Sequence, residues 1–144
     1  LSVIGLVISV HVLGMYAFSP LVGALSDKIG RIRVIQIGVL ILISAAVIAG
    51  LSPAMNTVSL GIGLFLLGLG WSCTLIAGST LLSESVSVDM KPSSQGASDL
   101  VMNLMGAIGG AASGIVIALL SYGWLCFLIG ALVLALAIWS LRIK

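Results

Sequence analysis

Side chains that can form ion pairs or exchange protons are scarce in this sequence, and they gather in one place. The chain has six Lys or Arg residues and four Asp or Glu residues, and four of these lie in the short stretch Gly23–Arg33. Its anion can meet the positive N-terminal end of another helix, and its cations suit the level of lipid headgroups. The residue types in this stretch therefore suit electrostatic contacts with a neighbouring helix and with lipid headgroups, and they do not indicate catalysis. Its charged residues are Asp27, Lys28, Arg31 and Arg33.

Three further polar or aromatic candidates, His11, Trp71 and Asn103, lie inside long apolar runs. His11 could bind a proton in a proton-coupled cycle, because histidine changes charge near neutral pH; a neutral imidazole that hydrogen-bonds to a neighbouring helix is the alternative. Trp71 could line a cavity and stack on an apolar solute, or it could pack against protein or lipid. Asn103 could donate a hydrogen bond in a cavity, and it should face protein or water because an amide in lipid is costly.

Glu84 and Asp99 flank the longest polar segment of the chain. Asp99 belongs to the first turns of a predicted helix, where a carboxylate complements the helix dipole. Glu84 ends the preceding helix, where the dipole is unfavourable, so we expect one of the cations Lys28, Arg31 and Arg33 to lie nearby. The alternative is a set of solvated charges that only fixes topology, since an exposed ion pair contributes at most about 1 kcal/mol.

Gly106, Gly110 and Gly114 recur at four-residue spacing, with other small residues beside them. This pattern lets helix backbones touch. We therefore expect tight helix packing on this face, with homodimerisation as a weaker alternative.

Signals for an enzyme, a metal or a cofactor are missing from the sequence. His11 is the only histidine, and the carboxylates lie far from it, so neither a metal cluster nor a catalytic triad is expected. Cys73 and Cys126 fall in apolar runs at different depths and are not expected to pair. A net charge of +2 is too small to suggest a nucleic-acid partner.

The composition indicates what must position these residues. The sequence is 60% hydrophobic and 7% charged, whereas soluble domains carry about a quarter charged residues. Its apolar runs can each cross a bilayer as a helix of roughly 20 residues, and they lack the alternation of strands. The sequence therefore predicts an all-α, polytopic bundle of five spanning helices, the first bent by Pro20. The expected spans are about 2–26, 32–51, 58–82, 94–120 and 124–141.

The six cations give this bundle an orientation. They lie in the first and third connections and in the C-terminal tail, while the second and fourth connections carry no charge. Five alternating spans place all six on one face, which is cytoplasmic by the positive-inside rule. We therefore expect an integral membrane protein with a cytoplasmic C-terminus.

The pattern Gly-x-x-x-Asp-Lys-x-Gly-Arg resembles the loop motif between the second and third helices of each half of the major facilitator superfamily. Ile32 replaces the usual second basic residue and Arg33 follows one place late, as is typical of the weaker copy in the second half. The resemblance implies that residues 1–144 are one transmembrane region, helices eight to twelve of a twelve-helix transporter; helices two to six are the alternative. The matching residues are Gly23, Asp27, Lys28, Gly30 and Arg31.

The resemblance also implies a function. It suggests secondary active transport of a small or drug-like solute by alternating access, coupled to H+, in the plasma membrane of a cell, with a bacterial inner membrane favoured. The motif would act as a conformational latch, Glu84 and Asp99 would join a cytoplasmic charge network, and the face of Gly106, Gly110 and Gly114 would slide on the missing N-terminal half. The rival hypothesis is a non-transporting membrane assembly subunit that packs through its glycine-rich faces.

Overall fold

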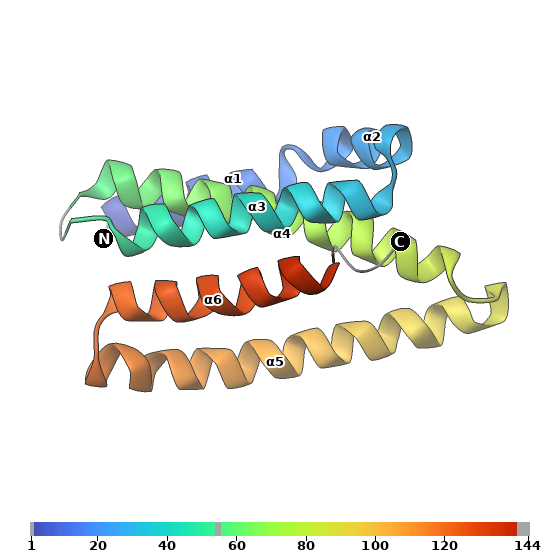
Figure 1. Cartoon of the computed structure of the whole chain (residues 1–144). Helices are drawn as coiled ribbons and strands as arrows, with labels where there is room; N and C mark the ends of the chain where they lie inside the picture. Colours follow the sequence, from blue (N-terminus) through green and yellow to red (C-terminus); the bar gives the residue numbers. More distant parts are fainter. Residues whose placement is uncertain (1, 54–55, 141–144) are drawn as a thin grey trace.

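The computed structural model describes residues 2–53 and 56–140, and this part of the chain contains helices and turns but no strand. Five segments are long and apolar enough to cross a membrane, the first of them formed by two consecutive helices (Figure 1). The prediction of an all-α, polytopic bundle is thus confirmed. The elements are α1 (Ser2–Tyr16), α2 (Ser19–Ile29), α3 (Arg31–Gly50), α4 (Thr57–Glu84), the short 3₁₀ helix η1 (Val88–Met90), α5 (Lys91–Leu119) and α6 (Tyr122–Ser140).

The first span is broken rather than bent. Helix α1 ends at Tyr16 and α2 begins at Ser19, so that α2 is set off from the line of α1 (Figure 1). Pro20 explains the break, because it has no N–H for the carbonyl of Tyr16 and its ring would clash with that carbonyl. Next to the break, the Ser19 hydroxyl donates to the Met15 carbonyl at 3.0 Å.

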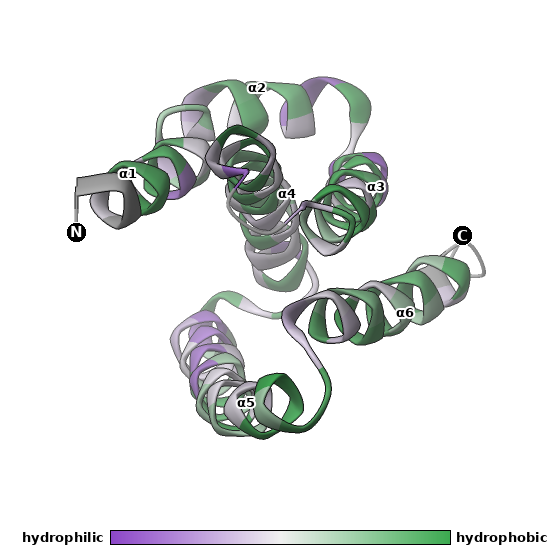
Figure 2. Ribbon diagram, turned by 90° about the vertical axis from the view of Figure 1, so that its left-hand side faces the viewer, coloured by the Kyte–Doolittle hydropathy of each residue, from purple (hydrophilic) through white to green (hydrophobic). Residues whose placement is uncertain are grey.

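Helix α4 is the centre of the bundle. It packs most extensively against α3 and then α1, while α6 packs on α3 (Figure 2). A small core of Val22, Val34, Cys73 and Ala77 joins α2, α3 and α4. Large apolar side chains on α5 and α6 are exposed, as expected for surfaces that meet lipid or another part of a membrane protein.

Glycines allow α3 to approach α4 closely. A Cβ on Gly38 would lie 3.0 Å from the carbonyl oxygen of Gly70, and a Cβ on Gly70 would lie 3.0 Å from that of Gly38. Neither position has room for a side chain without a backbone shift. The two helices therefore touch along their main chains, the packing that small residues permit in membranes.

Candidate functional site

A single residue, Gly30, connects α2 to α3. Its φ of 96° and ψ of 152° lie in a region essentially reserved for glycine. The Gly30 N–H donates to the carbonyl of Ser26 at 3.1 Å, which closes the last turn of α2. This conformation brings the end of α2 directly beside the start of α3, where Arg31 is the first helical residue.

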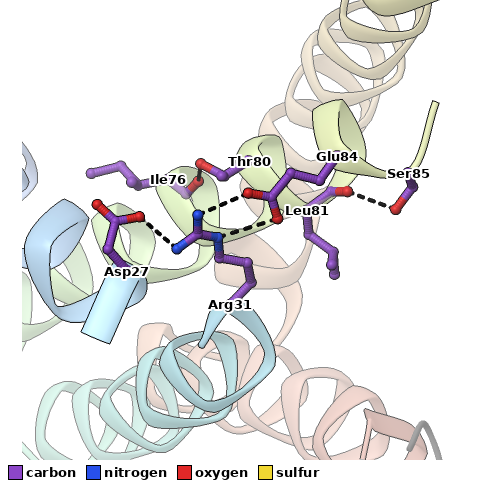
Figure 3. Close-up of polar contacts among 7 residues, drawn as sticks. All are labelled: Asp27, Arg31, Ile76, Thr80, Leu81, Glu84 and Ser85. Carbon is purple, nitrogen blue, oxygen red and sulfur yellow. Dashed lines mark hydrogen bonds and ion pairs between the residues drawn. The ribbon is translucent and has the colours of Figure 1, made fainter. Parts of the chain in front are cut away.

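Arg31 joins the ends of three helices (Figure 3). Its Nη1 donates to Asp27 Oδ1 at 2.6 Å, on the last turns of α2. Its Nη2 and Nε donate to the two carboxylate oxygens of Glu84, at 2.8 and 3.3 Å. Guanidinium is suited to this task because its planar fork matches a carboxylate and leaves a further donor for a second one. We call Asp27, Arg31 and Glu84 the arginine bridge.

The charges of the arginine bridge compensate an unfavourable helix end. Glu84 is the last residue of α4, where unpaired carbonyls give a negative partial charge, and Arg31 supplies the cation. The Arg31 side chain is 20% exposed, whereas those of Asp27 and Glu84 are 73% and 52% exposed. Ion pairs so open to solvent contribute little to stability, and the bridge matters chiefly as a tie between helices.

The hydroxyls beside the bridge take no part in it. Thr80 donates to the Ile76 carbonyl at 2.8 Å, and Ser85 donates to the Leu81 carbonyl at 2.7 Å (Figure 3). Both bonds run along α4, so the hydrogen bonds between helices in this view come from the three charged side chains.

The other members of the predicted motif lie outside the arginine bridge. Among the described residues, Lys28 and Arg33 form no ion pair, and both are exposed. A Cβ on Gly23 would meet nothing within 4 Å in the described part of the chain. No other described helix therefore approaches closely at Gly23.

Asp99 and Asn103 lie on α5, away from the bridge. The Asn103 side-chain amide donates to the backbone carbonyl of Asp99 at 2.8 Å, and both residues are exposed. Within residues 2–53 and 56–140, the Asp99 carboxylate has no ion-pair partner. Of the two acids singled out from the sequence, the structure brings only Glu84 to the motif.

His11 contacts the neighbouring helix through its ring. Its Nδ1 lies 2.8 Å from the carbonyl oxygen of Leu64 on α4. A carbonyl only accepts, so Nδ1 carries a proton and donates it to this bond. The contact matches the alternative of an imidazole bonded to a neighbouring helix, and it leaves Nε2 outside the bond to Leu64.

Two contacts between the first span and α4 were not anticipated. The hydroxyls of Ser19 and Ser72 lie 3.3 Å apart, and the rings of Tyr16 and Trp71 meet edge to face with centroids 6.3 Å apart. Trp71 thus packs against an aromatic partner. A signal for this face was present in the sequence, because the small residues Gly68 and Ser72 lie four positions apart and so share one face of α4, where both are buried.

The predicted packing face of α5 is uncovered in this part of the chain. A Cβ on Gly106, Gly110 or Gly114 would meet nothing within 4 Å of the described residues. No residue of α5 is buried, and its side-chain hydrogen bond to α4 joins Gln95 and Ser79 at 3.0 Å.

Metal-ligand types do not gather in the described residues, where no group of three His, Cys, Asp or Glu could hold an ion. Cys73 and Cys126 are both buried and free.

Comparison with known proteins gives one consistent result. The family described as Major Facilitator Superfamily matches residues 1–144. The chain is 37% identical over 145 residues to the uncharacterized MFS-type transporter YddS of Bacillus subtilis (strain 168), covering 99% of this chain and 33% of that protein. It is 38% identical over 143 residues to the uncharacterized MFS-type transporter YdeG of the same strain, covering 97% of this chain and 33% of that protein. The chain thus spans about a third of each relative, and no solved structure matches it.

Proposed function

Because this chain belongs to the major facilitator superfamily, we propose that it forms part of a secondary transporter that moves a small or drug-like solute by alternating access. The arginine bridge carries the proposal. It ties the ends of α2, α3 and α4 together on the side where the cations of the sequence gather. A transporter that rocks between two states needs contacts of this kind, which hold one end closed and can be broken at modest cost.

The proposed orientation places the arginine bridge in the cytoplasm. Lys28, Arg31, Arg33 and Lys91 all lie in the last or first turns of helices on that side, which supports a cytoplasmic location by the positive-inside rule. The bridge would then stabilise the outward-facing state by closing its cytoplasmic end. The protein would lie in a plasma membrane, such as a bacterial inner membrane, with the C-terminus inside.

Proton coupling through His11 is the second part of the proposal. Its Nδ1–H is fixed on the carbonyl of Leu64, so a proton could be exchanged at Nε2 without losing that bond. His11→Ala in the full-length protein should flatten the pH dependence of transport. An unchanged pH profile would remove His11 from the coupling mechanism.

The rival function is a membrane assembly subunit that transports nothing. The uncovered glycine face of α5 favours it, because such a face suits a permanent helix partner. A transport assay discriminates between the two functions, since only a transporter moves solute.

The test uses the full-length protein in proteoliposomes that contain a pH-sensitive dye. A panel of sugars, carboxylates, amino acids and lipophilic cations such as ethidium is added outside, and solute-driven proton movement is recorded. Movement with at least one compound is expected, and Asp27→Asn should slow it without preventing insertion, because it removes one arm of the arginine bridge.

Asp99→Asn is the matched control, since it neutralises a carboxylate that the bridge does not contain. Unaltered transport in Asp27→Asn would contradict the latch. If no compound of the panel drives proton movement, the assembly subunit would be favoured.

A further inference from the structure

The break in the first span lies deep in the membrane-spanning part of the chain. This segment runs over 25 residues from Gly5 to Ile29, and Tyr16, the last residue of α1, is close to its middle. Pro20 has no N–H, so the carbonyl of Tyr16 lacks its usual helical donor. Irregular backbone occurs at this depth only where protein or water borders it. The surroundings of the break are therefore protein or water rather than lipid.

The Tyr16 side chain carries a second polar group at this depth. It is 61% exposed, and its hydroxyl forms no hydrogen bond to the residues that the structure describes. Tyrosine in a membrane usually places its hydroxyl at the headgroups, which lie about 15 Å from the middle of a span. The Tyr16 hydroxyl cannot reach them, so it needs a hydrogen-bond partner other than the described residues.

Trp71 lies directly beside this tyrosine. The two rings meet edge to face, with 6.3 Å between their centroids and 67° between their planes. An edge-to-face contact covers a face of only one ring, so the other ring keeps both of its faces for a further partner. Since Trp71 is half-buried on α4 and Tyr16 is exposed, the pair is anchored on one side and open on the other.

Contacts on either side of Tyr16 hold it in place. A Cβ on Gly14 would lie 2.5 Å from the carbonyl oxygen of Phe65, so α1 touches the backbone of α4 just before the break. After Tyr16, the ring of Phe18 meets that of Phe65 edge to face, with centroids 5.8 Å apart. A side chain that is already positioned loses little freedom when it binds a ligand.

We infer that Tyr16 and Trp71 form a binding site for an uncharged planar aromatic solute that carries a hydroxyl or amino group. The solute lies against a free ring face of the pair, and its polar group bonds to the Tyr16 hydroxyl. The acids of these two spans, Asp27 and Glu84, both pair with Arg31, so the site offers no counter-charge for a cation. The inference rests on the proposed function, for which it names the class of solute.

Equilibrium binding of tritiated 2-naphthol to the purified full-length protein tests the site. This probe has fused aromatic rings and a hydroxyl, and saturable binding is expected. Two unlabelled competitors separate the contributions, because naphthalene lacks the hydroxyl and decahydro-2-naphthol lacks the aromatic faces. Each should compete about fivefold less well than unlabelled 2-naphthol. Equal competition by all three compounds, or binding that does not saturate, would overturn the site.

Trp71→Leu keeps an apolar side chain but removes the indole. It should raise the Kd for 2-naphthol about fivefold. Trp124→Leu is the matched control, because Trp124 is an exposed tryptophan on α6, and its Kd should equal that of the parent. Equal weakening by both substitutions would indicate partitioning onto any accessible indole and would overturn the site.

Tyr16→Phe removes the hydroxyl and keeps the ring pair. It should raise the Kd for 2-naphthol about threefold and leave the affinity for naphthalene unchanged. Both compounds are measured on the same variant, so a general loss of folded protein cannot produce this contrast. An unchanged Kd for 2-naphthol would overturn the role of the hydroxyl and with it the site.

The binding measurement does not depend on transport. Saturable, Trp71-dependent binding without any solute-driven proton movement would support the site and count against the transporter. Transport of other solutes without saturable binding of 2-naphthol would overturn the site and leave the proposed function standing.

Discussion

Helices α4 and α5 both carry glycines at helical spacing, but only the glycines of α4 contact other helices in the described part of the chain. On α4, a Cβ on Gly63 would lie 3.2 Å from the Cβ of Ala49, and Cβ atoms on Gly68 and Gly70 would meet neighbouring carbonyl oxygens. On α5, Cβ atoms on Gly106 and Gly110 would meet nothing within 4 Å in the described part of the chain.

This difference shows what a pattern of small residues can and cannot indicate. It marks a surface where a helix backbone can approach closely, but it does not say whether the partner helix lies in the same stretch of chain. Helix α4 has α1 and α3 as neighbours, whereas α5 makes few contacts with α4 and α6. Since the chain spans about a third of its curated relatives, a partner for α5 can come from the rest of such a protein or from a second copy.

The largest effect is expected from Gly68→Leu in the full-length protein. The side chain would have to enter the space of the α1 backbone at His11, so overpacking should exceed about 3 kcal/mol and reduce folded protein. Thermal unfolding in detergent and the yield of monodisperse protein measure this. Gly61→Leu is the matched control on the same helix, because nothing described lies within 4 Å of its Cβ position.

A smaller loss, about 2 to 3 kcal/mol, is expected from Gly110→Leu if a helix from outside this stretch covers α5. Melting temperature of the full-length protein is again the measurement, and Leu119→Ala at an exposed position of the same helix serves as control. A melting temperature equal to that of the parent would show that no helix packs on Gly110. Of α4 and α5, only α4 would then pack through its glycines.

The smallest effect, about 1 to 2 kcal/mol, is expected from Gly30→Ala. Gly30 also has nothing within 4 Å of a Cβ, but its φ of 96° strains any other residue. This variant therefore separates a glycine needed for its backbone angle from the packing glycines of α4. The melting temperature of the full-length protein measures this loss, and a melting temperature equal to that of the parent would contradict the assignment.

The membrane character and the helical segments could be predicted from the sequence, because each depends on the length and composition of one segment. The expected cation for Glu84 could be narrowed only to three candidates, since a sequence places all of them within a few residues of the turn. The structure selects Arg31, whose position after Gly30 aims the guanidinium at both acids. The break before Pro20 was expected as a bend, because the proline predicts a lost hydrogen bond but not how far the next helix turns away.

The sequence by itself determined the number of apolar segments, their length and the glycine-containing turn between the first two. Hydrophobic length and backbone freedom are properties of neighbouring residues. Only the tertiary structure decided which glycines touch another backbone, which tautomer His11 adopts and which cation meets Glu84. Those outcomes depend on distances between residues on different helices, such as His11 and Leu64 or Arg31 and Glu84, each pair 53 positions apart, and helix packing fixes these distances.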